Sequence, residues 1–148
     1  MKIKNHIISS AVVSSVFYTA TRSPAGALWS FLAGILLDAD HIIDYYLNYG
    51  FSLNFKKMHS LINEYCLPRI YILLHSFELL AIFWLVIFLM PLGMTYFAIA
   101  LGLTQHIVLD QICNPVMPLA YFLIYRAGHG FKRGDVLNLN KISPCQEP

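Results

Sequence analysis

Hydrophobic and polar positions alternate in long blocks along the chain, and these blocks predict helices. Four apolar segments are separated by polar or proline-containing breaks. They cover about Ile7–Thr21, Ala25–Leu47, Arg69–Met90 and Met94–Cys113. The last two are each near the roughly 20 residues that a bilayer-spanning helix needs, whereas the first is short. A fifth apolar run, Pro115–Tyr125, is too short to span, so we expect a short interfacial or re-entrant helix there. The pattern predicts an all-α fold.

Prolines and a polar loop divide the predicted helices from one another. Pro24 and Pro68 are placed to open the second and third helices, because proline is tolerated in the first helical turn. Between these helices lies a polar, mildly basic loop, Asn48–Leu67. Pro91-Leu92-Gly93 predicts a tight turn before the fourth helix. From Arg126 the chain becomes polar and basic.

The composition places these helices in a membrane. The chain has 148 residues, of which 57% are hydrophobic and only 12% charged. The charged share is about half that of a soluble domain, and the mean hydropathy is +0.59. We therefore predict a polytopic membrane bundle of about four transmembrane helices, the alternative being a very apolar soluble helical protein. The net charge of +2 is too small to indicate nucleic acid as a partner.

The basic residues predict the orientation of the bundle. With the N-terminus in the cytoplasm, only Arg22 falls on the outer side, so nine of the ten lysines and arginines are cytoplasmic. This predicts a multi-pass protein of the bacterial inner membrane with both termini in the cytoplasm. We expect a membrane-embedded metal-binding domain over residues 1–125 and a cytoplasmic basic tail over residues 126–148.

Two further features of the sequence bear on processing and redox state. Ile7–Ala20 could serve as a signal peptide, but Tyr18-Thr19-Ala20 is a poor cleavage site, so we expect a retained helix. Cys66, Cys113 and Cys145 are odd in number and far apart. They predict reduced thiols and no disulfide framework.

Several acids and histidines lie within or against the most apolar segments, where an unpartnered polar group is costly. The predicted topology brings seven of them, from four helices, to a similar depth near the cytoplasmic side. The candidate metal ligands are His6, Asp38, Asp40, His41, His75, His106 and Asp110. We predict that Asp40, His106 and Asp110 act in catalysis.

Each of these groups also has a simpler interpretation. His106 and Asp110, four residues apart, could satisfy one another within a helix. Asp38, Asp40 and His41 could form a solvated helix end; Asp38 and Asp40 are about 200° apart on an ideal helix, so both point inward only if the helix is irregular. His75 could be an interior histidine with a hydrogen-bond partner, and His6 could be interfacial. His59 and His129 lie in polar segments and are predicted to be at the surface.

Mixed aspartate and histidine ligands suit zinc, manganese or ferrous iron, whereas calcium prefers oxygen alone. Seven ligands exceed the four that one zinc normally takes, so we predict one or two divalent ions, with zinc first. Such ions activate water for hydrolysis, especially of phosphoesters. Neither Ser60 nor Ser76, each of which follows a histidine, is shown to be a nucleophile, and no HExxH motif occurs.

Three motifs together resemble a known family: Asp38-Ala-Asp-His41, His75-Ser76 and Gly102-Leu-Thr-Gln-His106-Ile-Val-Leu-Asp110. They are similar to those of small bacterial inner-membrane proteins classed as membrane-bound metal-dependent hydrolases, one of which is regulated by LexA. The resemblance covers roughly residues 6–115 and implies that the seven candidate ligands bind metal. Leu37 stands where the family usually has proline, and Pro68-Arg69 only partly matches a His-Arg pair that the family often carries. His59-Ser60 is a second match to the His-Ser motif.

The sequence thus predicts a metal-dependent hydrolase that acts on a phosphoester or lipid-linked substrate at the cytoplasmic face, with the lipid bilayer as its partner. A metal-ion or proton transporter is the first alternative, but Ala81–Met90 and Leu92–Leu101 lack the charged residues and histidines that often mark an ion path. A non-catalytic membrane scaffold is the second. A carboxylate-bridged iron oxidase is a weaker third, because His75-x-x-Glu78 reverses the usual order.

Overall fold

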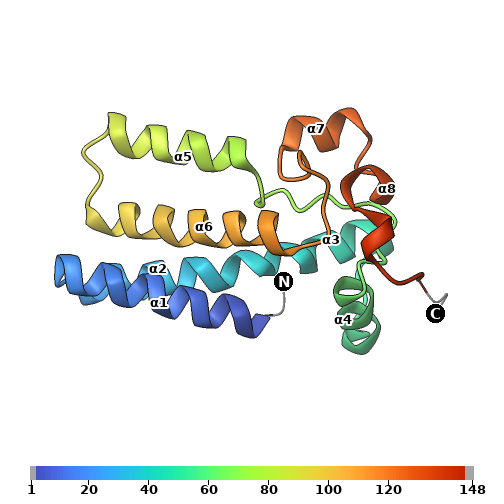
Figure 1. Cartoon of the computed structure of the whole chain (residues 1–148), viewed down its shortest axis with the longest axis horizontal. Coiled ribbons are helices and arrows are strands. Elements are labelled where there is room, and N and C mark those ends of the chain that lie inside the picture. Colours follow the sequence, from blue (N-terminus) through green and yellow to red (C-terminus); the bar gives the residue numbers. More distant parts are fainter. Residues whose placement is uncertain (1–2, 146–148) are drawn as a thin grey trace. The chain divides into compact units, whose positions relative to one another are not determined.

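The computed structural model describes residues 3–145, which form α-helices and 3-10 helices and contain no β-strand. The elements are α1 (Ile3–Thr21), α2 (Pro24–Leu36), η1 (Leu37–Ala39), α3 (Asp40–Tyr49), α4 (Phe55–Asn63), α5 (Phe77–Leu89), α6 (Met94–Cys113), α7 (Leu123–Gly128), α8 (Arg133–Val136) and η2 (Leu139–Lys141) (Figure 1). The predicted all-α fold is confirmed for this part of the chain. Lys2 and the last three residues of the predicted tail lie outside the described residues.

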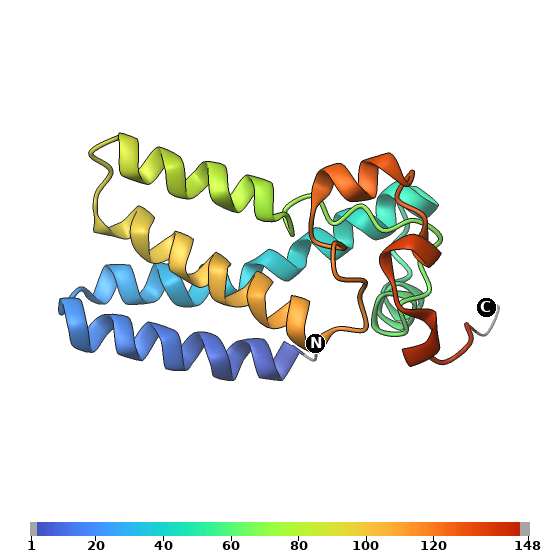
Figure 2. The ribbon, with the colours of Figure 1, turned by 45° about the horizontal axis from the view of Figure 1, so that its top comes forward.

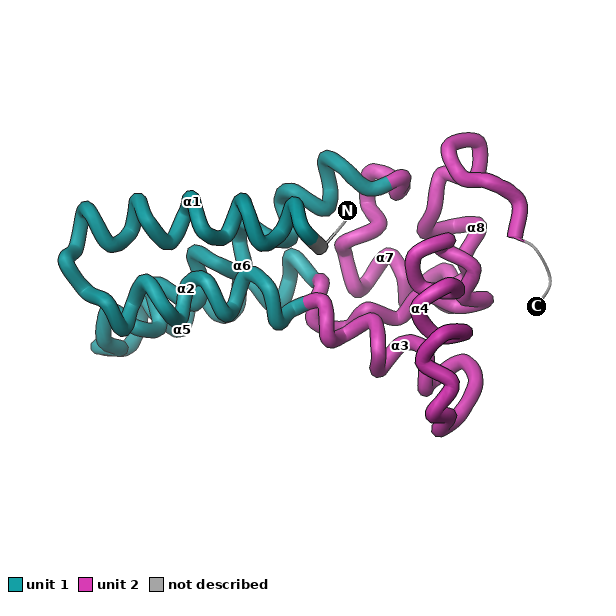
Figure 3. Tube along the Cα trace, turned by 90° about the horizontal axis from the view of Figure 1, so that it is seen from below, with its two compact units in different colours: residues 1–37, 76–114 teal, residues 38–75, 115–148 magenta. Residues whose placement is uncertain are grey.

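The chain forms two compact units, each built from two separate stretches of sequence (Figure 3). Unit 1 contains residues 1–37 and 76–114, and unit 2 contains residues 38–75 and 115–148. Residues 126–145, which were expected to form a separate tail, therefore belong to the same compact unit as the loop between the second and third predicted helices.

Unit 1 is a bundle of α1, α2, α5 and α6, in which α2 packs against both α1 and α6, and α5 packs against α6 (Figures 1 and 2). Small residues permit the close approach of the helices. A Cβ at Gly102 would collide with the carbonyl oxygen of Ser30, and one at Gly34 would collide with the hydroxyl of Ser10. This is the packing by small residues that is typical of helices in membranes, where van der Waals contact replaces the hydrophobic effect.

The outer surface of unit 1 is strongly apolar. Val12 and Val16 on α1 are 57% and 63% exposed, and Phe88 and Leu89 on α5 are each 74% exposed. Among the described residues, two helical stretches are long and apolar enough to cross a membrane, Pro24–Tyr49 and Met94–Cys113. The apolar helix α5 has only 13 residues, about 20 Å. Membrane association is therefore favoured, but four spanning helices are not confirmed.

The second predicted helix, Ala25–Leu47, is not one regular α-helix. The 3-10 turn η1 interrupts it at Leu37–Ala39, and α3 begins at Asp40. This is the irregularity that Asp38 and Asp40 require if both are to face the interior. The fourth helix was predicted correctly at Met94–Cys113.

The third predicted helix, Arg69–Met90, begins eight residues late, and that prediction is wrong for its first part. Only Phe77–Leu89 is helical, with Ser76 as the N-cap: its hydroxyl accepts a hydrogen bond from the backbone N–H of Leu79. The segment Arg69–Ser76 is irregular because side chains bind its backbone. The carboxylates of Asp44 and Asp40 accept hydrogen bonds from the N–H groups of Tyr71 and Leu74, at 2.7 Å each.

Unit 2 contains α3, α4, α7 and α8, and a buried hydrophobic cluster of Tyr45, Leu61 and Leu67 lies where α3 and α4 pack together. The predicted short helix at Pro115–Tyr125 begins only at Leu123, where α7 starts. Its first residues instead pair with a distant part of the unit, where the N–H of Met117 donates to the carbonyl of Val136. That backbone pairing leaves the N-terminal part of the apolar run non-helical.

The cysteine prediction is wrong for two of the three residues. Cys66, just after α4, forms a disulfide with Cys145 near the C-terminus, across 79 residues of sequence. Cys113 is a free, exposed thiol, as predicted. Because nothing in the spacing of two such distant cysteines signals a contact, the pairing depends on the way unit 2 folds.

The close approach at Gly102 yields a prediction. Gly102→Ala would push the α6 backbone away from α2 at Ser30, and we expect overpacking to cost about 1–3 kcal/mol of stability. The measurement is thermal unfolding of the detergent-solubilised protein. Gly93→Ala, at the start of the same helix, is the control, because a Cβ there meets nothing within 4 Å. Equal losses in the two variants would contradict this packing.

Candidate metal site

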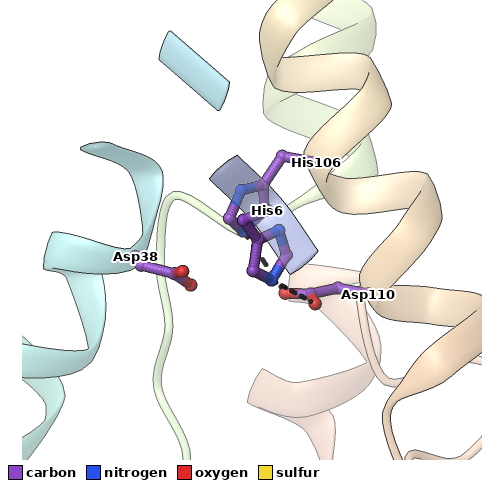
Figure 4. A group of neighbouring side chains, drawn as sticks. All are labelled: His6, Asp38, His106 and Asp110. Carbon is purple, nitrogen blue, oxygen red and sulfur yellow. Dashed lines mark ion pairs between the residues drawn. The ribbon is translucent and has the colours of Figure 1, made fainter. Parts of the chain in front are cut away.

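The candidate ligands within unit 1 form the first group: His6 on α1 with His106 and Asp110 on α6, which Figure 4 draws together with Asp38. His6 Nε2 lies 3.1 Å from Asp110 Oδ1, and His106 Nε2 lies 3.3 Å from Asp110 Oδ2. The two imidazole rings stack with their centroids 3.9 Å apart. Every side chain of this group is at most 1% exposed. The structure thus joins the first helix to the His106–Asp110 pair.

Two features of the fold position this group. The carbonyl of Gly34 can only accept, so His106 Nδ1, at 2.7 Å, donates its hydrogen to it. This fixes the tautomer and turns Nε2 towards Asp110. Gln105, beside His106, donates to Ser9 Oγ at 2.8 Å and accepts from Ser10 Oγ at 3.1 Å. These bonds hold α1 against α6 and so hold His6 beside His106.

The second group lies within unit 2 and consists of Asp38 on η1, His41 on α3 and His75 just before α5. Asp38 Oδ1 lies 3.6 Å from His41 Nε2 and 3.9 Å from His75 Nε2. The His75 side chain is fully buried, but those of His41 and Asp38 are 27% and 23% exposed. This group therefore has a side that solvent can reach.

Asp40 lies behind His75. Its Oδ2 accepts a hydrogen bond from the N–H of Leu74 and lies 3.3 Å from His75 Nδ1. An ionised carboxylate only accepts, so His75 donates through Nδ1 and directs Nε2 towards Asp38 and His41. A carboxylate behind a ligating histidine is the usual orienting partner at metal sites. The structure thus places Asp40 against His75 Nδ1 and outside the two groups of candidate ligands, while its predicted role in metal binding and catalysis stays a prediction.

Both groups have the composition of an open metal site: two histidines and one carboxylate. Two ligands of a tetrahedral zinc lie roughly 3.3 Å apart, because each is about 2.0–2.1 Å from the ion. The 3.1 and 3.3 Å separations in unit 1 match this spacing, and those in unit 2 are slightly wider. His106 Nε2 and Asp110 Oδ2, 3.3 Å apart, can be bridged by a hydrogen or by a metal ion. The residues therefore fit a divalent metal.

The remaining histidines and serines are accounted for without catalysis. His59 is exposed and lies 3.0 Å from the Asn63 side chain, and His129 is exposed and donates from Nδ1 to the carbonyl of Tyr125, so both surface predictions are confirmed. The Ser60 hydroxyl donates to Glu64, and the Ser76 hydroxyl donates to Glu78. Neither serine has the histidine partner that an activated nucleophile needs.

Two buried charged residues were missed by the sequence analysis. Asp44 is 1% exposed and accepts from Tyr71 N–H. Its spacing of four residues from Asp40 places both on one face of α3, and this signal could have found it. Arg126 is fully buried, although the sequence assigned it to a polar tail. No local signal distinguishes it from the other basic residues there.

Comparisons of the chain with protein-family models, curated proteins and solved structures find no match. The resemblance in the three motifs is therefore a prediction, and the case for a metal site stands on the geometry of the two groups.

Substitution of the ligands should separate the two groups. We expect His106→Ala to lower metal affinity in unit 1 and His75→Ala to lower it in unit 2, each by at least ~100-fold. Metal should also leave as the pH is lowered, because a protonated imidazole nitrogen cannot bind it. The measurement is metal content by mass spectrometry after purification.

The exposed histidines provide matched controls. His59→Ala and His129→Ala remove the same side chain outside both groups and should leave the metal content unchanged. Negligible metal in the unsubstituted protein, or equal metal in all variants, would rule out the site.

Proposed function

We propose that the protein is a membrane-bound metal-dependent hydrolase, in which a metal-activated water attacks a phosphoester or a lipid-linked substrate at the cytoplasmic face. The observation that carries this proposal is the repeated ligand set of two histidines and one carboxylate, with His75 and His106 each oriented through Nδ1. Three protein ligands leave coordination positions for water and substrate, as in catalytic zinc sites.

The chemistry of the ligands supports zinc first, with manganese or iron as alternatives. Imidazole suits zinc and iron, whereas sites that hold only calcium or magnesium use oxygen ligands. His6, His106 and Asp110 would hold one ion, and Asp38, His41 and His75 would hold one as well. Asp40 would keep His75 in the binding tautomer. The partial exposure of Asp38 and His41 makes the unit 2 group the one that a substrate can approach.

The apolar surface of unit 1 supports placement in a membrane, and we propose that α1, α2, α5 and α6 all enter the bilayer. The 13 residues of α5 cover about 20 Å, less than the roughly 30 Å hydrocarbon core. The bilayer would have to thin around it, or flanking residues would have to reach the interface. A lipid or lipid-linked substrate is the class that an enzyme in this location meets most readily.

Hydrolysis can be tested with the metal-loaded protein in detergent or nanodiscs. We expect it to cleave bis(4-nitrophenyl) phosphate or to release a phospholipid head group. His75→Ala should lower the rate at least ~100-fold, because a bound metal ion stabilises the transition state by several kcal/mol. His129→Ala is the control and should keep full activity. Saturable metal uptake into vesicles without any hydrolysis would instead support the transporter alternative.

Two observations make the orientation testable. Nine of the ten basic residues favour cytoplasmic placement of the loop and tail. The Cys66–Cys145 disulfide joins those same two segments, whereas cytoplasmic disulfides are usually transient or redox-sensing. We propose the cytoplasmic orientation, in which this disulfide would be reduced in the growing cell.

A Cys66→Ser, Cys113→Ser variant leaves Cys145 as the sole thiol of the three. In intact spheroplasts, a membrane-impermeant maleimide should label it only after lysis. Labelling before lysis would place the tail on the oxidising side and overturn the cytoplasmic orientation.

A further inference from the structure

We propose that Arg126 is a positioning residue for the metal ligand His75, acting through the backbone of the segment that carries it. The inference rests on the proposed metal group of unit 2 and adds to it a residue outside the ligand motifs. All the contacts that support it lie within unit 2.

The burial of Arg126 is costly and therefore needs compensation. Its side chain is fully buried and is the largest of the fully buried side chains among the described residues. A guanidinium cannot lose its charge at any pH a protein survives, so its N–H groups must be hydrogen-bonded where it is buried. The hydrogen bonds of the buried guanidinium therefore show which part of the chain it stabilises.

The guanidinium donates to three backbone carbonyl oxygens. One amino group donates to His75 at 3.0 Å and to Ala120 at 2.6 Å. The other donates to Ile72 at 3.0 Å. Two of these carbonyls lie at the ends of the turn that leads into His75, because the N–H of His75 itself donates to the carbonyl of Ile72. Arg126 thus binds this turn at both ends.

The same segment is held from its other side by α3. Asp44 and Asp40 accept hydrogen bonds from the N–H groups of Tyr71 and Leu74. Ile72 has φ +31, a backbone conformation that β-branched residues rarely adopt. A turn of this kind persists only when its surroundings fix it, and here carboxylates hold its N–H groups while Arg126 holds its carbonyls.

The contacts of Asp40 and Arg126 together determine where His75 Nε2 lies. Asp40 sets the rotation of the ring through Nδ1, and Arg126 sets the position of the backbone from which the ring projects. Metal affinity depends steeply on such support, because ligands displaced by a fraction of an ångström no longer share one ion. Loss of Arg126 should therefore weaken metal binding in unit 2 specifically.

The test uses the full chain with His106→Ala as background, so that binding reports unit 2. Cobalt(II) is the probe, because its visible absorption reports both occupancy and ligand geometry. Arg126→Met should lower cobalt affinity about 10–100-fold and change the spectrum. Arg126→Lys keeps the charge and some of the donors, so it should restore part of the affinity.

Arg133→Met is the matched control. Arg133 also lies in unit 2 and its Nε donates to a backbone carbonyl, that of Tyr65, at 2.6 Å. Its loss should lower thermal stability without altering the cobalt spectrum. Unchanged affinity and spectrum in folded Arg126→Met or Arg126→Lys, or the same affinity loss in Arg133→Met, would overturn the positioning role. Absence of cobalt binding in the His106→Ala background itself would instead refute the unit 2 metal group.

Discussion

A carboxylate beside two imidazoles favours a positive charge between them, and this electrostatic arrangement occurs in both units of the chain, around the buried Asp110 and the partly exposed Asp38. In each unit, one histidine directs its Nδ1 hydrogen to a protein oxygen, the carbonyl of Gly34 for His106 and the carboxylate of Asp40 for His75. Each ring is thereby left with Nε2 facing a carboxylate. A proton or a metal ion can supply this charge, and the second histidine within ligand distance in both groups makes each of them able to hold a metal ion.

Helix packing and ligand orientation are coupled at Gly34. The residue lacks a Cβ, which would otherwise collide with Ser10 on α1 and come close to the Gln105 side chain on α6. Its carbonyl also accepts the hydrogen bond of His106. A change that separates α2 from α6 would therefore remove the partner that fixes the histidine tautomer. In unit 1 the stability of the bundle and the geometry of the ligands depend on the same contacts.

Local sequence patterns predicted the helices whose boundaries depend on neighbouring residues. The Pro91-Leu92-Gly93 turn and the mainly apolar run after it predicted α6 at Met94–Cys113. The pattern predicted one helix across Asp38 and Asp40, although both side chains could face the interior only if that helix was irregular, and η1 provides the irregularity. The segment Arg69–Ser76 could not be predicted, because its hydrophobic pattern is helical and its conformation is set by Asp40, Asp44 and Arg126, which are distant in sequence. The disulfide was missed for the same reason.

The two ligand groups share a composition but differ in exposure, and under the proposed function this difference implies a different role for each. The unit 1 residues are at most 1% exposed, so an ion there would exchange slowly and chiefly stabilise the bundle. In unit 2, Asp38 and His41 are about a quarter exposed, which leaves room for solvent and substrate at the coordination sphere. His75, the buried member, is the one whose ring and backbone are both held, by Asp40 and Arg126. A site that combines an accessible side with one rigidly held ligand meets the geometric demands of catalysis better than a sealed one.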